Sequence, residues 1–262
     1  MNTKIRTLAA LTAGTVVTVT MLSGPAFAAG EPTESTFSSA EIGAIKAASD
    51  PDPFTAKEID EARAESATKD KRLGIAGGVG TLDVPPPPPA SSYLADNHVA
   101  QAYSNYCGPA TARMTLLHQG KNCSQATLAG RFGITPNNGG TSWDAMLSAL
   151  KNLSGVGYAG EFLAYSPSAA DKASYKSRLQ VDISHYRGSI AGNVWEVPNG
   201  PHLTGHPNKE IFHWVNIRGY KESGRYSQVQ DPATSVWSGV PANSPVDSDK
   251  LVVMMGGRGY QW

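Results

Sequence analysis

One cysteine of the chain stands where a thiol could become a nucleophile. Cys107 directly precedes Gly108 and Pro109, and residues 108–119 (GPATARMTLLHQ) predict a helix that Gly120 ends. The free backbone N–H groups and the dipole at the start of a helix stabilise an anion, so they lower the pKa of a thiol placed there. Pro109 suits the first turn, which needs no N–H donor, and Gly108 would let a substrate approach. Cys107 is therefore a candidate nucleophile.

The second cysteine, Cys123, offers an alternative, because two cysteines in one chain can form a disulfide. A helix over residues 108–119 is about 18 Å long. The four residues from its end to Cys123 reach back at most about 14 Å. A disulfide needs Cα atoms about 4.4–6.8 Å apart. We therefore expect both thiols to be free and Cys123 to be a small buried apolar residue.

A thiol nucleophile needs a base, usually a histidine that a third group orients. His213 opens the stretch HWVNIRGY, which together with YSQVQDP predicts an antiparallel hairpin. A turn centred on residue 222 puts His213 opposite Asp231, whose carboxylate could fix the tautomer of the imidazole and stabilise its charge. Alternatively, Asp231 only starts the Asp-Pro turn, a common position for this residue. Both roles can hold at once.

The other five histidines carry a weaker signal. His202 and His206 have the i, i+4 spacing of a helical metal site, but the prolines and the glycine around them exclude the helix. We expect no metal and no cofactor, since a calcium-loop pattern is also missing. Substitution of His98, His118 or His206 is expected to be nearly silent.

A glutamine completes the set of candidate site residues. Gln101 lies six residues before Cys107, in the loop that leads to the helix. A side-chain amide in this place could donate a hydrogen bond to the oxyanion that forms when a thiolate attacks a carbonyl. A loop glutamine alone means little, and the proposal depends on its position before Cys-Gly-Pro.

The elements that must hold these residues change from helices to strands along the chain. Helices are predicted at residues 108–119, 124–132 and 141–155, where apolar residues recur at helical spacing and Ser124 can cap the second helix. Strands are predicted at residues 188–197, 213–220, 226–232 and 250–256. Helices followed by antiparallel strands indicate an α+β fold.

Composition divides the chain into three parts. Residues 1–28 have a basic start, an apolar run and a small-residue end at Ala28, which is typical of a secretory signal and predicts an extracellular protein. Residues 29–90 are acidic and end in five consecutive prolines; we interpret them as a linker or a pro-segment, and favour a flexible linker with two helices, one capped by Thr55 and Glu58. Residues 91–262 form the predicted catalytic domain, and residues 30–84 are expected to be removable because their apolar stripe is thin.

Charge and hydropathy exclude two classes of partner. The formal net charge is zero, and the sequence has no basic run or basic-aromatic stripe, so nucleic acid is not an expected partner. Beyond the signal, no segment is apolar over the length that a membrane span requires. The expected partner is a peptide or protein substrate.

The motifs together resemble a known family. Gln101-x5-Cys107-Gly-Pro-Ala, His213-Trp-Val and Gln-Asp231-Pro, in this order, resemble the papain-like cysteine peptidases. More closely, they resemble the bacteriocin-processing peptidases, which remove double-glycine leaders, and their stand-alone secreted relatives. The resemblance covers about residues 95–255 and implies a papain-like α+β fold. It implies that Cys107 is the nucleophile, His213 the general base, Asp231 its orienter and Gln101 the oxyanion donor.

Several functions fit these four residues. The first is a secreted cysteine peptidase that hydrolyses peptide bonds; an acyl transferase or a murein peptidase could use the same groups, and a non-catalytic binding module would not need all four. The best-known relatives act beside an ATP-driven exporter. This sequence shows neither transporter helices nor a nucleotide-binding loop, so we do not extend leader processing to it.

Overall fold

The computed structural model of the protein describes residues 35–75 and 86–262. The predicted secretory signal and the GGVG stretch at residues 77–80 lie outside the described residues. Both described ranges belong to one compact unit.

An antiparallel sheet forms the centre of this unit. Within the described residues it has seven strands, in the order β2-β7-β3-β4-β5-β6, and β1 pairs with β4 beside this path. The longest ladder joins β3 and β4 over seven residue pairs, from Ile190 opposite Ile217 to Glu196 opposite Ile211. The strands are β1 (Ser92–Tyr93), β2 (Gly160–Phe162), β3 (Ile190–Glu196), β4 (Ile211–Lys221), β5 (Tyr226–Gln230), β6 (Asn243–Asp247) and β7 (Gly259–Gln261).

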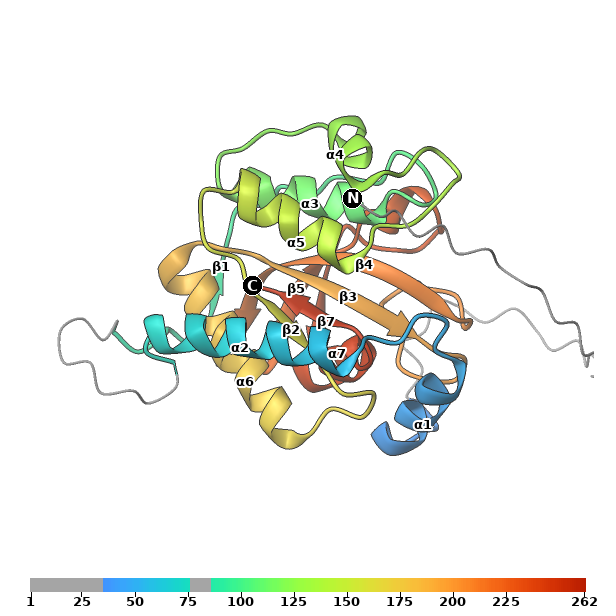
Figure 1. Ribbon diagram of the computed structural model, residues 1–262, viewed down its shortest axis with the longest axis horizontal. Helices are drawn as coiled ribbons and strands as arrows, with labels where there is room; N and C mark the ends of the chain where they lie inside the picture. Colours follow the sequence, from blue (N-terminus) through green and yellow to red (C-terminus); the bar gives the residue numbers. More distant parts are fainter. Residues whose placement is uncertain (1–34, 76–85) are drawn as a thin grey trace, which may run out of the picture. The chain divides into compact units, whose positions relative to one another are not determined.

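Helices cover the two faces of the sheet (Figure 1). On one face, α3 (Cys107–His118), α4 (Gln125–Phe132) and α5 (Trp143–Leu153) form an apolar core against Ala191 and Trp214. On the other face, α6 (Ala169–Val181) and α7 (Ser248–Met255) pack against residues such as Val194 and Val215. Burial on both faces explains why every residue of β3 is buried. The predicted α+β class is confirmed.

Serine caps fix where α4 and α5 begin. Ser124 accepts a hydrogen bond from the Thr127 N–H at 3.0 Å, as predicted, and Ser142 accepts one from Ala145 at 3.2 Å.

Two further helical turns are short: the π-helical η1 (Asp182–Tyr186), which follows α6, and the 3-10 helix η2 (Pro232–Ser235), which follows β5.

One predicted strand is wrong. Residues 250–255 belong to α7, because Asp247 caps a helix there by accepting from the N–H groups of Asp249 and Lys250, both at 3.0 Å. Every residue from Leu251 to Met255 is buried. A segment that is buried all round shows neither a helical nor a strand period, so its apolar run did not distinguish the two.

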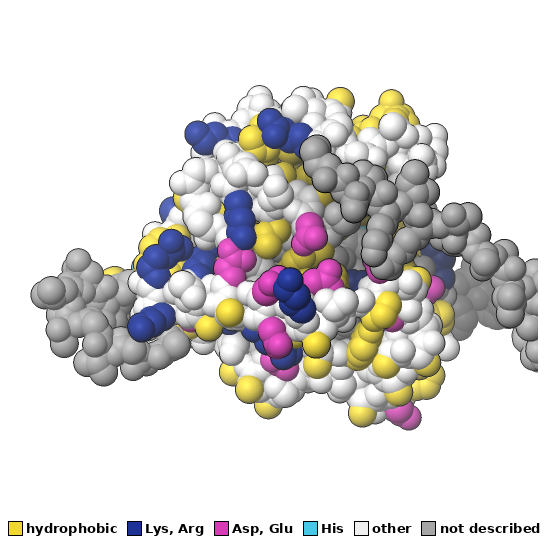
Figure 2. Space-filling model, viewed as in Figure 1, with side chains coloured by type: hydrophobic (Ala, Val, Ile, Leu, Met, Phe, Trp, Pro, Cys, Tyr) yellow, Lys and Arg dark blue, Asp and Glu magenta, His cyan; other side chains and the backbone are white. Residues whose placement is uncertain are grey.

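The two predicted helices of the N-terminal segment are present. They are α1 (Ser39–Ser49), whose cap is Ser38, and α2 (Ala56–Arg72), whose cap is Thr55. The predicted capping box forms: Thr55 N–H donates to Glu58 at 2.7 Å, and Glu58 N–H donates to Thr55 at 3.3 Å. Acidic and basic side chains lie intermixed on the exposed side of α2 (Figure 2).

Polar side chains anchor this segment to the domain. The Lys46 ammonium is buried and donates to three carbonyls at the end of α7, those of Val253, Met254 and Gly256, at 2.9–3.0 Å. Asp70 of α2 forms a buried ion pair with Arg178 of α6, with 2.6 Å between Oδ2 and Nη2. The expectation that the segment offers the domain little surface is therefore wrong. It rested on the thin apolar stripe of the segment, and buried polar side chains such as Lys46 and Asp70 are not part of that stripe.

None of the helices in the described ranges is both long and apolar enough to cross a bilayer.

Candidate active site

Cys107 is the first residue of α3, and neither it nor Cys123 is in a disulfide. The helix has no side-chain cap at its N-terminus, so the N–H groups of its first turn are free for the thiol or a ligand. The backbone N–H groups of Trp214 and Gly108 act to lower the pKa of the Cys107 thiol. A Cβ at Gly108 would collide with Thr141, so this glycine is needed for packing.

His213 of β4 lies between the thiol and a carboxylate. Its Nε2 is 2.9 Å from Oδ1 of Asp231, which leaves Nδ1 for the Cys107 sulfur. Burial favours the uncharged imidazole, but the charges and hydrogen bonds of Asp231 and Cys107 outweigh it and raise the pKa of His213 to about 10. Burial also raises the pKa of the Cys107 thiol, and the hydrogen bond and charge of His213 more than reverse this, so its pKa is lowered. The lowered pKa of Cys107 and the raised pKa of His213 together favour a thiolate–imidazolium pair.

Asp231 has both roles that the sequence left open. It caps η2 by accepting from Ala233 N–H at 2.8 Å, and the same Oδ1 accepts from His213. Although burial raises the pKa of this carboxyl, His213 and the neighbouring His206 hold it well below its usual range. Asp231 is therefore an anion at neutral pH.

The predicted hairpin register is wrong, although the predicted contact forms. The ladder pairs Lys221 with Tyr226 and Asn216 with Gln230, so Asp231 lies beyond the end of β5 and not opposite His213. The turn has four residues, 222–225, with positive φ at Glu222, and a bulge follows between residues 217 and 219. Each feature moves the register away from a turn centred on residue 222.

Gln101 lies beside Asp231, because its backbone N–H donates to the Pro232 carbonyl at 2.8 Å. Its side chain is buried, and Nε2 donates to the carbonyls of Tyr103 and Ser104 at 2.9 and 2.8 Å. Both amide hydrogens thus hold the loop that leads to Cys107. A substrate oxyanion would have to replace one of these carbonyls.

Cys107 opens into a cleft of about 310 Å³. Its walls include residues 140–144, the β4 residues Phe212 and Trp214, and, from the N-terminal segment, Asp52, Pro53, Phe54 and Glu58. The Phe54 ring lies against Phe162, with 3.9 Å between ring centroids. The chain between α1 and α2 therefore forms one wall of the cleft that holds the thiol.

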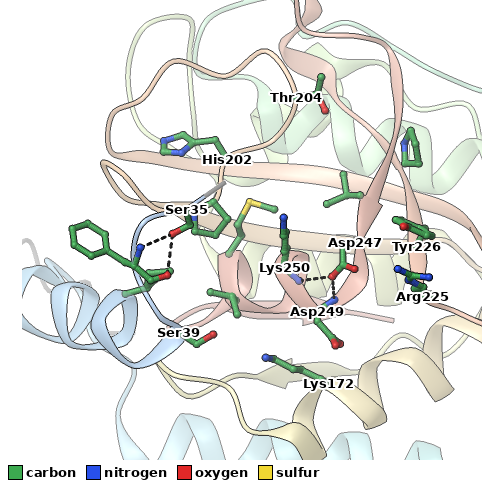
Figure 3. A pocket seen from close by; sticks show the side chains of 17 residues that line it. Ser35, Ser39, Lys172, His202, Thr204, Arg225, Tyr226, Asp247, Asp249 and Lys250 are labelled. Atoms are coloured by element: carbon green, nitrogen blue, oxygen red, sulfur yellow. Dashed lines mark hydrogen bonds between the residues drawn. The ribbon is translucent and has the colours of Figure 1, made fainter. Parts of the chain in front are cut away.

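A larger cavity of about 660 Å³ lies elsewhere, between the start of α1, β6 and α7 (Figure 3). Lys172, Arg225, Lys250 and two aspartates surround it, so its charge is mixed. None of the four predicted site residues lines it. We assign it no part in the chemistry.

Sequence reasoning missed two residues of the site. His206 contacts both Glu196 and Asp231, each at 2.9 Å, and the three side chains are buried. Atoms of His206, His213 and Asp231 lie within 4.8 Å of one another, close enough for a shared metal ion. A metal would displace the hydrogen bond between Asp231 and His213, so we interpret the cluster as held by that hydrogen bond and by the ion-pair contact between His206 and Asp231. The glycine and prolines around His206 gave no signal that its loop folds onto Asp231.

A comparison with sequence models of protein families shows the family of the chain. The sequence model of the Peptidase_C39-like family matches residues 92–248, which is more than half of the chain. No match was found among curated proteins. Three similar solved structures are the peptidase domain of ComA from Streptococcus, a bi-functional ABC transporter involved in quorum sensing, a putative C39-like peptidase from Bacillus anthracis, and digestive procathepsin L 3 of Tenebrio molitor.

All three similarities are distant. The ComA domain is 17% identical with a TM-score of 0.41, and the alignment covers 64% of this chain and 96% of that one. The Bacillus anthracis protein is 13% identical, with a TM-score of 0.42 and coverages of 65% and 96%. The procathepsin is 14% identical, with a TM-score of 0.42 and coverages of 86% and 90%.

Proposed function

Because the chain belongs to the Peptidase_C39-like family and is a cysteine peptidase of papain-like fold, we propose that it is a secreted enzyme that hydrolyses peptide bonds through Cys107, His213, Asp231 and Gln101. The observation that carries the assignment of residues is the position of His213, with one ring nitrogen 2.9 Å from Asp231 and the other left for the Cys107 sulfur. Secretion rests on the signal-like sequence of residues 1–28.

The first half of the reaction makes an acyl-enzyme. The Cys107 thiolate attacks the carbonyl carbon of the scissile amide, and the C=O electron pair moves to the oxygen. When the intermediate collapses, the C–N bond breaks and His213 gives its proton to the leaving nitrogen. The product amine departs and the acyl group stays on sulfur as a thioester.

The second half releases the acyl group. Neutral His213 takes a proton from water, whose oxygen attacks the thioester carbon. The C–S bond breaks, Cys107 leaves as thiolate, and His213 is again protonated beside Asp231. Throughout, the Asp231 carboxylate holds the imidazole in one orientation and stabilises its charged form.

Two groups are proposed to hold the oxyanion. The backbone N–H of Cys107 is free of intrahelical partners at the start of α3. The second donor is the Gln101 amide, whose hydrogens bond to Tyr103 and Ser104 before substrate binds. Exchange of one of these bonds for a bond to an anion is favourable, since hydrogen bonds to charged groups are stronger than those to carbonyls.

Residues 35–75 are proposed to be a pro-segment rather than a free linker. The support is the position of Asp52, Pro53 and Phe54, which line the cleft beside Cys107 where a substrate would bind. Phe54→Ala should increase kcat/KM for peptides with bulky side chains, because it removes a ring from the cleft. Unchanged or lower kcat/KM, with the fold intact, would show instead that Phe54 belongs to the substrate-binding wall.

The test of the proposed function uses the full chain and a mixed peptide pool. Mass spectrometry should find hydrolysis products with the parent protein and none with Cys107→Ala or His213→Ala, both folded by circular dichroism. Addition of a primary amine separates hydrolysis from acyl transfer, since a transferase would yield amides. Absence of any product, with both thiols intact, would contradict the proposal.

A further inference from the structure

A second buried histidine lies behind the Asp231 carboxylate. The Nε2 atom of His206 is 2.9 Å from Oδ2 of Asp231, the oxygen that His213 does not use. On the other side of the ring, Nδ1 is 2.9 Å from Oε2 of Glu196. The contact with Glu196 is an aligned hydrogen bond, and that with Asp231 is an ion-pair contact.

These groups are fully enclosed. The side chains of His206 and Glu196 are 0% exposed, and that of Asp231 is 3% exposed. Buried carboxylates are costly unless they are paired and hydrogen-bonded, and Glu196 has both oxygens occupied. Oε2 accepts from His206, and Oε1 accepts from the backbone N–H of Leu203 at 2.9 Å.

The loop that carries His206 is held in one conformation. It connects β3, which ends at Glu196, with β4, and it comes back so that His206 N–H donates to the Leu203 carbonyl at 3.1 Å. Gly205 has φ of +81°, and a Cβ there would collide with the Gly239 backbone. The Trp237 ring packs on His206 at 4.6 Å between centroids. The imidazole therefore has little freedom to leave Asp231.

We propose that His206 and Glu196 are positioning residues, which extend the site to the row Glu196, His206, Asp231, His213. The proposal rests on the proposed function, in which Asp231 orients the base. His206 holds the second oxygen of Asp231, while Ala233 N–H and His213 hold the first. Glu196 in turn fixes the orientation and the charge of His206.

The charges around His206 affect the titration of His213. Burial opposes its protonation, but Asp231 and Glu196 outweigh burial and raise the pKa of His206. Each ring nitrogen lies 2.9 Å from a carboxylate oxygen, which can only accept a hydrogen bond, so the geometry favours a cationic ring. This cation weakens the negative field that Asp231 presents to His213, and the two imidazoles are only 5.3 Å apart. The charged form of His213 is therefore less stable in the presence of His206 than it would be beside Asp231 alone.

Other charged groups near the row lie further out. Lys209 is over the Trp237 ring at 5.6 Å, and His202 is 4.0 Å from Glu196. The ring nitrogens of His202 contact the backbone carbonyls of Gly200 and Lys209 at 2.9 and 3.1 Å. His202 shares the loop but does not contact Asp231, so it provides a matched control.

The test compares pH profiles of His206→Gln, Glu196→Gln and His202→Gln in the full chain. For kcat/KM on a cleaved peptide, His206→Gln should lower the maximum about tenfold or more and move the alkaline limb, because Asp231 loses the group that holds its second oxygen. Glu196→Gln should lower the maximum less, since His206 remains beside Asp231. His202→Gln should leave both the maximum and the limbs unchanged.

Two further measurements do not depend on peptide hydrolysis. The rate of Cys107 alkylation by iodoacetamide reports the same His213 titration, so it tests the row even if the proposed function fails. Nitrogen-15 NMR of the histidine rings in the parent protein should show His206 protonated on both nitrogens at pH 7. A neutral His206 ring, or profiles of folded His206→Gln that superimpose on the parent's, would overturn the proposal. If His206→Gln does not fold, Glu196→Gln and the NMR spectrum decide.

Discussion

The Oδ1 atom of Asp231 lies 2.9 Å from Nε2 of His213, although the two residues are not paired in the β4–β5 ladder. The contact exists because Asp231 follows the last residue of β5 and caps η2, so its side chain is held by Ala233 N–H as it meets the imidazole. A turn residue thus orients the proposed base.

Replacement of this carboxylate should weaken the enzyme without silencing it. Asp231→Asn keeps the size of the side chain but removes the charge that raises the pKa of His213. We expect a little activity to remain, unlike in His213→Ala, because base and nucleophile are both still present. The alkaline limb of kcat/KM should move to lower pH. A limb at the parent position would show that Asp231 does not set the titration of His213.

Gln101→Ala should lower kcat by an amount that corresponds to roughly 2.7–4 kcal/mol, the usual effect of one oxyanion donor. The rate of Cys107 alkylation by iodoacetamide should stay unchanged, because that reaction forms no oxyanion. If alkylation slows as much as peptide hydrolysis, Gln101 acts through the loop that it holds at Tyr103 and Ser104.

The pH dependence of activity should be broad on its alkaline side. Since the pKa of Cys107 is lowered and that of His213 is raised to about 10, the ion pair persists from below the ordinary thiol range to about pH 10. The stabilisation that His213 gives the fold is complete below its ordinary pKa of about 6.5 and is lost as pH rises through about 10. Titration of kcat/KM measures both limbs, and an alkaline limb near pH 7 would contradict the ion pair.

The anchoring of α2 predicts a stability difference between two ion pairs. Asp70→Ala leaves buried Arg178, which is 7% exposed, without one of its two carboxylates, and should lower the free energy of unfolding by about 3 kcal/mol. Glu61→Ala breaks the ion pair between Glu61 and Lys57, whose side chains are 68% and 83% exposed, respectively. The free energy of unfolding should fall by less than about 1 kcal/mol. Urea unfolding measures both. Equal, small losses would mean that α2 is not part of the cooperative unit.

The local signals in the sequence predicted the first helices and the site contact well. The caps at Ser124 and Thr55 and the helix that begins at Cys107 depend on residues close in sequence, so spacing alone predicts them. The hairpin register depended on the exact turn and on a bulge, which the sequence does not encode in a simple pattern. The predicted contact between His213 and Asp231 forms despite the wrong register, because Asp231 lies beyond the end of β5.

Long-range polar contacts were beyond prediction from the sequence. His206 reaches Asp231 only because its loop folds back over the sheet, and Lys46 finds its three carbonyls 207 or more residues along the chain. Neither contact has a periodic or composition signal. The prediction of a strand at residues 250–256 was wrong for another reason. A helix that is buried on all sides has no polar face, so its sequence shows no helical period.

Covalent labelling tests whether Cys107 is a nucleophile that His213 activates. The full chain is treated with a peptide-like electrophile that reacts with thiols, and its intact mass and labelled residue are determined by mass spectrometry. We expect one label per chain, on Cys107. In folded His213→Ala, Cys107 should be labelled at least ten times more slowly. Labelling of Cys123 instead, or an undiminished rate for Cys107 in His213→Ala, would contradict it.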